Sequence, residues 1–166
     1  MEENTLIRLD ALEAVLYEYG EEVARYYREN LDRDDRYASG ELVRSVEARV
    51  AINGTAYQVQ LRLADYWKYV EWDTTPHWPP PGALLKWIEI KPVIPRPDEK
   101  GHIPTPKQLA YLIGRKISEE GTTGSHTLRN TLEEVNERYL ERMKQALAED
   151  LGKAVRGWII QFLVES

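Results

Sequence analysis

Hydrophobic residues recur at helical spacing in four stretches of the chain. Residues 5–31 and 128–151 form the two long stretches, and residues 82–90 and 106–120 form two shorter ones. Thr105-Pro106 is a typical helix start, because threonine caps the helix and proline is tolerated in its first turn. The pattern therefore predicts two long and two short amphipathic helices.

Alternating apolar and polar residues on the far side of Asn53-Gly54 predict a β-hairpin. Asn-Gly is the strongest short-range hairpin signal, because both turn positions must tolerate positive φ. Residues 56–63 alternate cleanly, so the apolar side chains should share the more buried face and the polar ones the opposite face. The apolar set is Tyr57, Val59, Leu61 and Leu63, and the polar set is Gln58, Gln60 and Arg62.

The fold class that follows is α+β. We expect one domain over residues 1–166, with its core within residues 5–164 and an antiparallel sheet built on a central hairpin. The long N-terminal and C-terminal helices should pack against that sheet. Residues 158–164 are rich in β-branched and aromatic side chains, which favours a further strand over an extension of the last helix. Gly20 interrupts the first helical pattern and indicates a close packing contact or a kink.

Two proline-rich segments should be irregular, over residues 66–82 and 92–105. The first holds three of the five tryptophans and the run Pro79-Pro80-Pro81, which cannot continue a central strand. Several aromatic residues on a loop are typical of an interaction site, although each tryptophan alone could equally fold back onto the core. The candidate protein-interface residues are Tyr66, Trp67, Glu71, Trp72, Asp73, His77, Trp78, Pro79 and Pro80.

Composition excludes several classes. The net charge of -6 and the interleaving of acids with bases argue against general nucleic-acid binding, which needs clustered Lys and Arg. Cysteine is absent, so disulfides, thiol nucleophiles and Cys-based zinc sites are excluded. No leader pattern opens the chain, and no run approaches the roughly 20 apolar residues of a membrane span. We expect a soluble domain that does not contact a membrane.

Candidate chemistry is sparse. His77, His102 and His126 lie in three separate predicted loops without metal-ligand spacing, so we expect no metal and no cofactor. Ser39 and Ser125 lack a nucleophile motif, and turn or capping roles explain both. The carboxylates that flank Trp72, on Glu71 and Asp73, are the candidate acid–base pair of a small hydrolase. The competing interpretation leaves both acids solvated or paired with a neighbour.

The order of several short motifs resembles small head–tail connector and tail-completion proteins of tailed bacteriophages. The segment SGELVRS (residues 39–45) precedes the hairpin, and Tyr66, Val70 and Glu71 match the Y-x-x-x-V-E motif that follows it. WIEIK (residues 87–91) and residues 117–122 match the later helix and its Gly-Thr end. The first Gly-Thr of the family pattern is replaced by Asp73-Thr74. The resemblance covers most of residues 37–125.

The resemblance implies a non-enzymatic virion protein with no catalytic residues. Such proteins oligomerise into a ring, hexameric or dodecameric, that joins the head to the tail and contacts portal, neck or tail proteins. The ring would be assembled in the host bacterial cytoplasm, and DNA would pass through it without specific binding. An acidic subunit would suit such a lumen. Two alternatives stay open: a carbohydrate- or peptide-binding module that uses the tryptophan loop, and the hydrolase based on Glu71 and Asp73.

Overall fold

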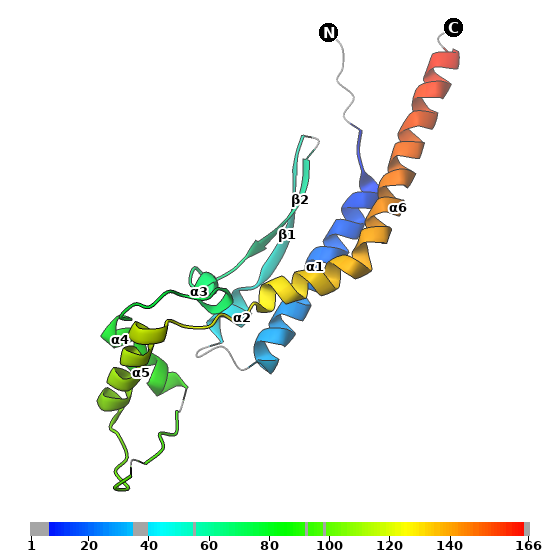
Figure 1. Ribbon diagram of the computed structural model, residues 1–166. Coiled ribbons are helices and arrows are strands. Elements are labelled where there is room, and N and C mark those ends of the chain that lie inside the picture. The colour runs from blue at the N-terminus through cyan, green and yellow to red at the C-terminus, as the bar shows by residue number, and fades with distance from the viewer. Residues whose placement is uncertain (1–6, 35–39, 55, 92, 98, 165–166) are drawn as a thin grey trace.

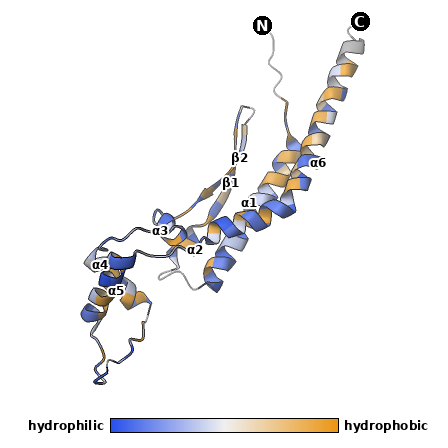
Figure 2. Cartoon of the chain, in the orientation of Figure 1, coloured by the Kyte–Doolittle hydropathy of each residue, from blue (hydrophilic) through white to orange (hydrophobic). Residues whose placement is uncertain are grey.

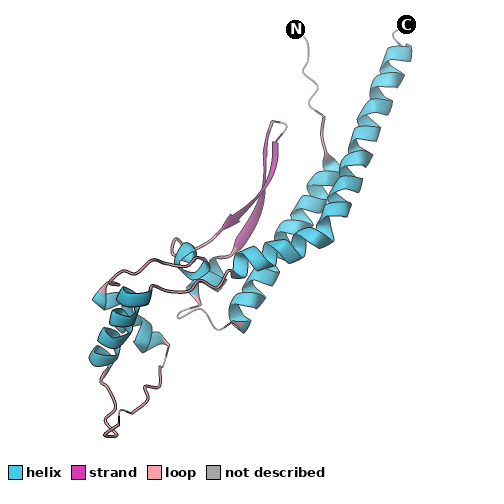
Figure 3. Cartoon of the chain, in the orientation of Figure 1, coloured by secondary structure: helices cyan, strands magenta, loops and turns pink. Residues whose placement is uncertain are grey.

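The computed structural model describes residues 7–34, 40–54, 56–91, 93–97 and 99–164, which form an elongated α+β fold (Figures 1 and 3). The helices are α1 (Asp10–Arg33), α2 (Glu41–Ser45), α3 (Trp67–Glu71), α4 (Pro81–Ile90), α5 (Pro106–Glu120) and α6 (Thr127–Val164), and the strands are β1 (Glu47–Asn53) and β2 (Ala56–Arg62). The two strands form an antiparallel hairpin. The predicted fold class is therefore confirmed.

The hairpin has the predicted turn and the predicted faces. Asn53 pairs with Ala56, and Gly54 adopts the positive φ of 61° that its turn position requires. Along β2 the apolar side chains are half-buried and the polar ones are exposed, so the register is the one that the alternation predicted.

Helix α1 lies between the hairpin and α6 (Figure 1). Its backbone comes close to the hairpin at buried Gly20, where a Cβ would lie 3.2 Å from both Ala48 Cβ and Val59 Cγ1. Gly20 is therefore the close packing contact that the interrupted pattern indicated. The core lies further along α1, between its C-terminal half, α2 and the residue that precedes β1. It consists of Ala24, Tyr27, Leu31, Leu42 and Val46.

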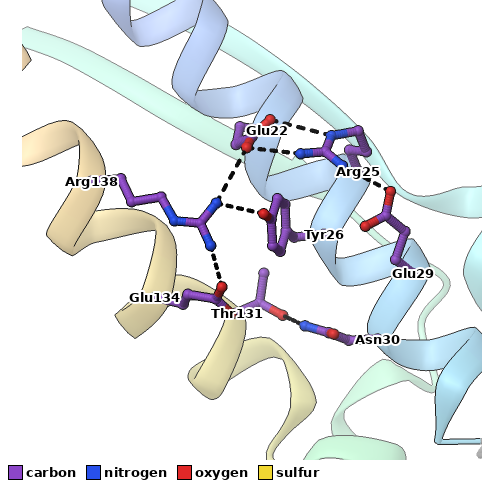
Figure 4. A network of polar contacts seen from close by, with 8 residues as sticks. All are labelled: Glu22, Arg25, Tyr26, Glu29, Asn30, Thr131, Glu134 and Arg138. Atoms are coloured by element: carbon purple, nitrogen blue, oxygen red, sulfur yellow. Dashed lines mark hydrogen bonds and ion pairs between the residues drawn. The ribbon is translucent and has the colours of Figure 1, made fainter.

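The α1–α6 interface is largely polar at its edge (Figure 4). The Arg138 guanidinium donates to the Tyr26 hydroxyl and to Glu134, and lies 3.7 Å from Glu22. Deeper in the same interface, the Asn30 amide donates to Thr131 Oγ1 at 2.9 Å, and Thr131 is fully buried. Buried polar groups are costly unless they are paired, so this bond fixes the relative position of the two helices.

Helix α6 is longer than predicted and continues to Val164, so the prediction of a strand at residues 158–164 is wrong. Each residue added to an existing helix gains a backbone hydrogen bond locally, whereas a strand needs a neighbouring strand. The hairpin is distant from this segment and supplies none (Figure 1).

The start of α1 also differs from the prediction. The helix begins at Asp10, and residues 7–9 are not helical, while Thr5, the first residue of the predicted helix, lies outside the described residues. The carboxylate of buried Asp150 on α6 accepts hydrogen bonds from Ala11 N at 3.2 Å and Leu12 N at 2.9 Å. A carboxylate 138 residues away in sequence therefore satisfies the first turn of α1.

Helices α4 and α5 pack on each other and lie at the opposite end of the molecule from the C-terminus of α6 (Figure 1). Their approach is close at buried Gly114, where a Cβ would lie 3.3 Å from Leu84 Cδ1. The predicted start of α5 is confirmed, with a reciprocal capping box between Thr105 and Gln108. Within the predicted irregular segment 66–82, α3 forms a helical turn and Pro81 starts α4, so only residue 66 and residues 72–80 lack helix.

Candidate interaction surfaces

Glu71 joins the tryptophan-rich segment to the start of α6. Its side chain is 1% exposed, and its two carboxylate oxygens accept hydrogen bonds from Leu128 N at 2.8 Å and Arg129 N at 2.9 Å. These amides belong to the first turn of α6, where N–H groups have no partner within the helix and the helix dipole favours negative charge. Glu71 is therefore a helix cap inside the protein, with both carboxylate oxygens hydrogen-bonded to backbone amides of α6.

The segment after Glu71 pairs with the segment before α6. Thr74 and Thr122 form an antiparallel bridge, and the carboxylate of Asp73 accepts a hydrogen bond from Gly124 N at 2.8 Å. Gly121 has a φ of 76°, and a Cβ there would lie 2.0 Å from the Thr74 carbonyl oxygen. Asp73-Thr74 and Gly121-Thr122, two positions singled out by the resemblance, thus face each other across one joint.

Tyr27 lies in the core, near Glu71. Burial raises the pKa of its hydroxyl above the usual value, and the nearby carboxylate of Glu71 raises it further. Among the described residues the hydroxyl has no hydrogen-bond partner. Tyr27 therefore stays neutral.

The three histidines occupy separate environments. His126 Nε2 lies 3.6 Å from Asp73 Oδ1, and its ring meets Trp72 edge-on. His77 Nδ1 lies 2.8 Å from the Thr75 carbonyl oxygen, and His102 lies beside α5. Within the described residues no three metal-ligating side chains come together.

The predicted interface residues divide into exposed and internal ones. Trp67 is half-buried and packs against the core beside Val70. Glu71 is buried and does not form part of the surface, whereas Pro79 is largely buried and lines the concave surface beside Trp78. The exposed members are Tyr66, Trp72, Asp73, His77, Trp78 and Pro80.

Trp78 borders an apolar concave surface on α4 and α5. Its ring is 50% exposed and lies 5.7 Å from the ring of Tyr111, centroid to centroid. Two adjoining hollows, of about 250 and 500 Å³, share Lys107 and Tyr111. We call them together the α4–α5 hollow. Its lining residues are Trp78, Pro79, Leu84, Leu85, Arg96, His102, Pro104, Lys107, Gln108, Ala110, Tyr111 and Leu112.

A second apolar surface lies at the far end of α6, and the sequence prediction missed it. Because Asp150 contacts the first turn of α1, residues 151–164 extend beyond α1; we call them the α6 tip (Figures 1 and 2). Trp158, Ile159 and Ile160 are exposed there. In the sequence these residues form an apolar run, but its β-branched and aromatic side chains led to the prediction of a strand. Read as a helix, the same run places apolar side chains on several sides.

Comparisons with known proteins assign no family. No family model matches the chain, and no curated protein or solved structure matches it significantly. Among the described residues, no helix is both long and apolar enough to cross a membrane.

Proposed function

We propose that this protein is a structural component of a phage virion, a neck or tail-completion subunit that assembles into a ring between head and tail. One observation carries the proposal: the elongated subunit has two unlike apolar surfaces, the α4–α5 hollow and the α6 tip, at its opposite ends (Figure 1). Large exposed apolar surfaces are typical of interaction sites. Two different surfaces that meet head to tail close a ring when the rotation between copies is suitable.

The residues that carry the sequence resemblance have structural roles, which supports a scaffold protein. Gly40 precedes α2 with a φ of 69°, and Leu42 is buried in the core. Ser45 Oγ accepts a hydrogen bond from Ala64 N at 2.8 Å and so ties α2 to the chain after the hairpin. Glu71 and Gly121 hold the joint before α6. Each of these residues holds two segments of the chain together, so the motifs that contain them maintain the shape of the subunit.

The solution mass of the purified protein tests the proposal. We expect light scattering to give a discrete multiple of 19.3 kDa for the protein alone, or a discrete larger complex after it is mixed with portal and neck proteins. A strict monomer under both conditions would contradict it. If that monomer bound soluble glycans and lost binding in Trp78→Ala, the carbohydrate-binding alternative would replace the ring. Turnover that disappears in Glu71→Gln without loss of fold would favour the hydrolase instead.

A further inference from the structure

Helices α4 and α5 form a unit with packing of its own, which we call the arm (residues 77–120; Figure 1). Gly114 on α5 lies against α4 and the tryptophan-rich segment, because a Cβ there would lie 3.3 Å from Leu84 Cδ1 and 3.5 Å from the ring of Trp78. Ala110, one turn earlier on α5, is buried. The main packing partner of each helix is the other one, so the arm has a small apolar core of its own.

The other elements pack around a different core. We call these elements, α1, α2, the hairpin, α3 and α6, the body. The half-buried apolar side chains that surround the core of the body belong to residues 43–70 and to Leu128. None of the described residues between 77 and 120 contributes to it.

The joint that precedes α6 belongs to the body. Ser125 N donates to the Val70 carbonyl oxygen at 2.8 Å. Gly124 fits so closely that a Cβ there would lie 2.3 Å from the Glu71 carbonyl oxygen. Together with the carboxylate cap on α6, these contacts fix the chain to the body as far as the Thr74–Thr122 pair.

Two short connectors join the arm to the body. The body ends at the Thr74–Thr122 pair, in which each N–H donates to the other carbonyl oxygen, at 2.9 and 3.3 Å. The arm begins at the next bond outward, from His77 N to the Ile117 carbonyl oxygen at 3.4 Å. Between these bonds lie Thr75-Pro76 on one connector and the end of α5 with Gly121 on the other.

Gly121 suits a pivot. Its φ is 76°, and glycine has the widest range of backbone conformations of any residue. Hinges are loop or element-terminal residues that absorb changes in φ and ψ. Because the two connectors lie side by side at one end of the arm, a rotation about them changes the direction of the arm and leaves both cores intact.

We propose that the arm pivots as a rigid body about Thr75-Pro76 and Gly121. The motion turns the α4–α5 hollow to different directions relative to α1 and α6 (Figure 1). It takes place within one chain, so the inference holds whether or not subunits form a ring.

Distances between pairs of spin labels test the pivot in the full chain. Because the sequence contains no cysteine, two exposed residues at a time can be changed to cysteine and labelled. The arm–body pair is Lys107→Cys with Glu137→Cys. The body pair is Glu21→Cys with Glu137→Cys, and the arm pair is Glu89→Cys with Lys107→Cys. Dilution into unlabelled protein restricts the measurement to pairs within one chain.

We expect a wider distance distribution for the arm–body pair than for the other two pairs. Lys107 lies near the start of α5 and the pivot lies at its end, about 20 Å away at about 1.5 Å per residue. A rotation of about 15° therefore moves the label on Lys107 by about 5 Å. An arm–body distribution as narrow as that of the body pair would overturn the inference. An arm pair as wide as the arm–body pair would overturn it too, since the arm would not be rigid.

Two loop substitutions locate the motion. Thr75→Gly frees the backbone beside Pro76, so the arm–body distribution should widen further while the other two stay unchanged. Ile94→Gly, at a 90% exposed residue in a loop of the arm, is the matched control and should leave all three distributions as in the wild-type protein. If Thr75→Gly had no effect, or if Ile94→Gly widened the arm–body distribution equally, the motion would not lie at the connectors and the inference would fail.

Discussion

At the residue scale, two buried carboxylates control where the long helices begin. Glu71 caps α6 and Asp150 caps α1, each from a part of the chain distant in sequence. Such caps satisfy backbone N–H groups that would otherwise lie unpaired inside the protein. They also make the position of α6 depend on the tryptophan-rich segment, since Glu71 belongs to α3.

Glu71→Gln should lower the free energy of unfolding by about 1.5–3 kcal/mol. The amide of glutamine places an NH₂ group against a backbone N–H donor and removes the charge that favours the helix start. Urea unfolding followed by circular dichroism measures the change. Glu137→Gln, on an exposed residue of the same helix, is the control and should change stability by less than about 0.5 kcal/mol. Equal effects in the two variants would contradict the capping role.

Tyr27→Phe should stabilise the protein at neutral pH by about 1 kcal/mol, because it removes a buried hydroxyl that has no partner among the described residues. The variant should also resist alkali better. Burial raises the pKa of Tyr27 in the folded state, whereas an unfolded tyrosine ionises near pH 10. The folded state holds this proton more tightly, so stability is fully present below about pH 10 and falls above it.

Unfolding free energies measured from pH 8 to pH 11.5 check this prediction. The wild-type value should fall more steeply above pH 10 than that of Tyr27→Phe. Tyr69→Phe, on an exposed tyrosine, is the control and should keep the wild-type slope. Identical slopes in all three proteins would show that Tyr27 does not govern the alkaline limit.

At the element scale, sequence patterns predicted correctly those elements that are determined by neighbouring residues. Asn53-Gly54 and the alternation after it gave the hairpin and its register, and Thr105-Pro106 gave the start of α5. The prediction for the end of α6 was wrong, because β-branched residues favour a strand only when a neighbouring strand is present. The Asp150 cap was invisible as well, since its partners, the amides of Ala11 and Leu12, are far away in sequence.

The candidate surface was predictable only in part, for the same reason. Clustered aromatic and proline residues correctly indicated exposed Trp72 and Trp78. The same cluster could not reveal that Glu71 turns inward to α6, or that Trp67 packs on the core. Those outcomes depend on contacts with α1 and α6 that no local pattern encodes.

The joint between residues 72–80 and residues 121–126 should depend on Gly121. Gly121→Ala should lower the free energy of unfolding by about 2 kcal/mol or more, because the new Cβ meets the Thr74 carbonyl oxygen and the φ of 76° is unfavourable for alanine. Gly82→Ala is the control: nothing lies within 4 Å of its Cβ, and alanine favours helix α4. Thermal unfolding of both variants checks the prediction. A Gly121→Ala variant as stable as the wild-type protein would contradict it.

At the scale of the whole molecule, the charge and the shape favour assembly through apolar ends. Charged side chains pair along the α1–α6 shaft, as between Arg142 and Glu18 and between Arg25 and Glu29. These exposed pairs add little stability but keep the shaft soluble. The apolar α4–α5 hollow and the α6 tip lie at the ends, so a copy that shields both ends must be part of a larger assembly.

Two tryptophans of one segment should separate folding from assembly. Trp78→Ala removes a ring that is half exposed at the hollow, so we expect association to weaken by about 2 kcal/mol while the melting temperature of the isolated subunit changes little. Trp67→Ala removes a ring that packs on the core, so it should instead cost about 3 kcal/mol of folding stability. Trp72→Ala, at a ring that is 49% exposed, should resemble Trp78→Ala if the contact extends beyond the hollow.

Light scattering measured beside thermal unfolding distinguishes these effects. If Trp78→Ala lost fold and assembly together, its ring would belong to the packing of α4 on α5. If it changed neither, the hollow would not be the contact between subunits.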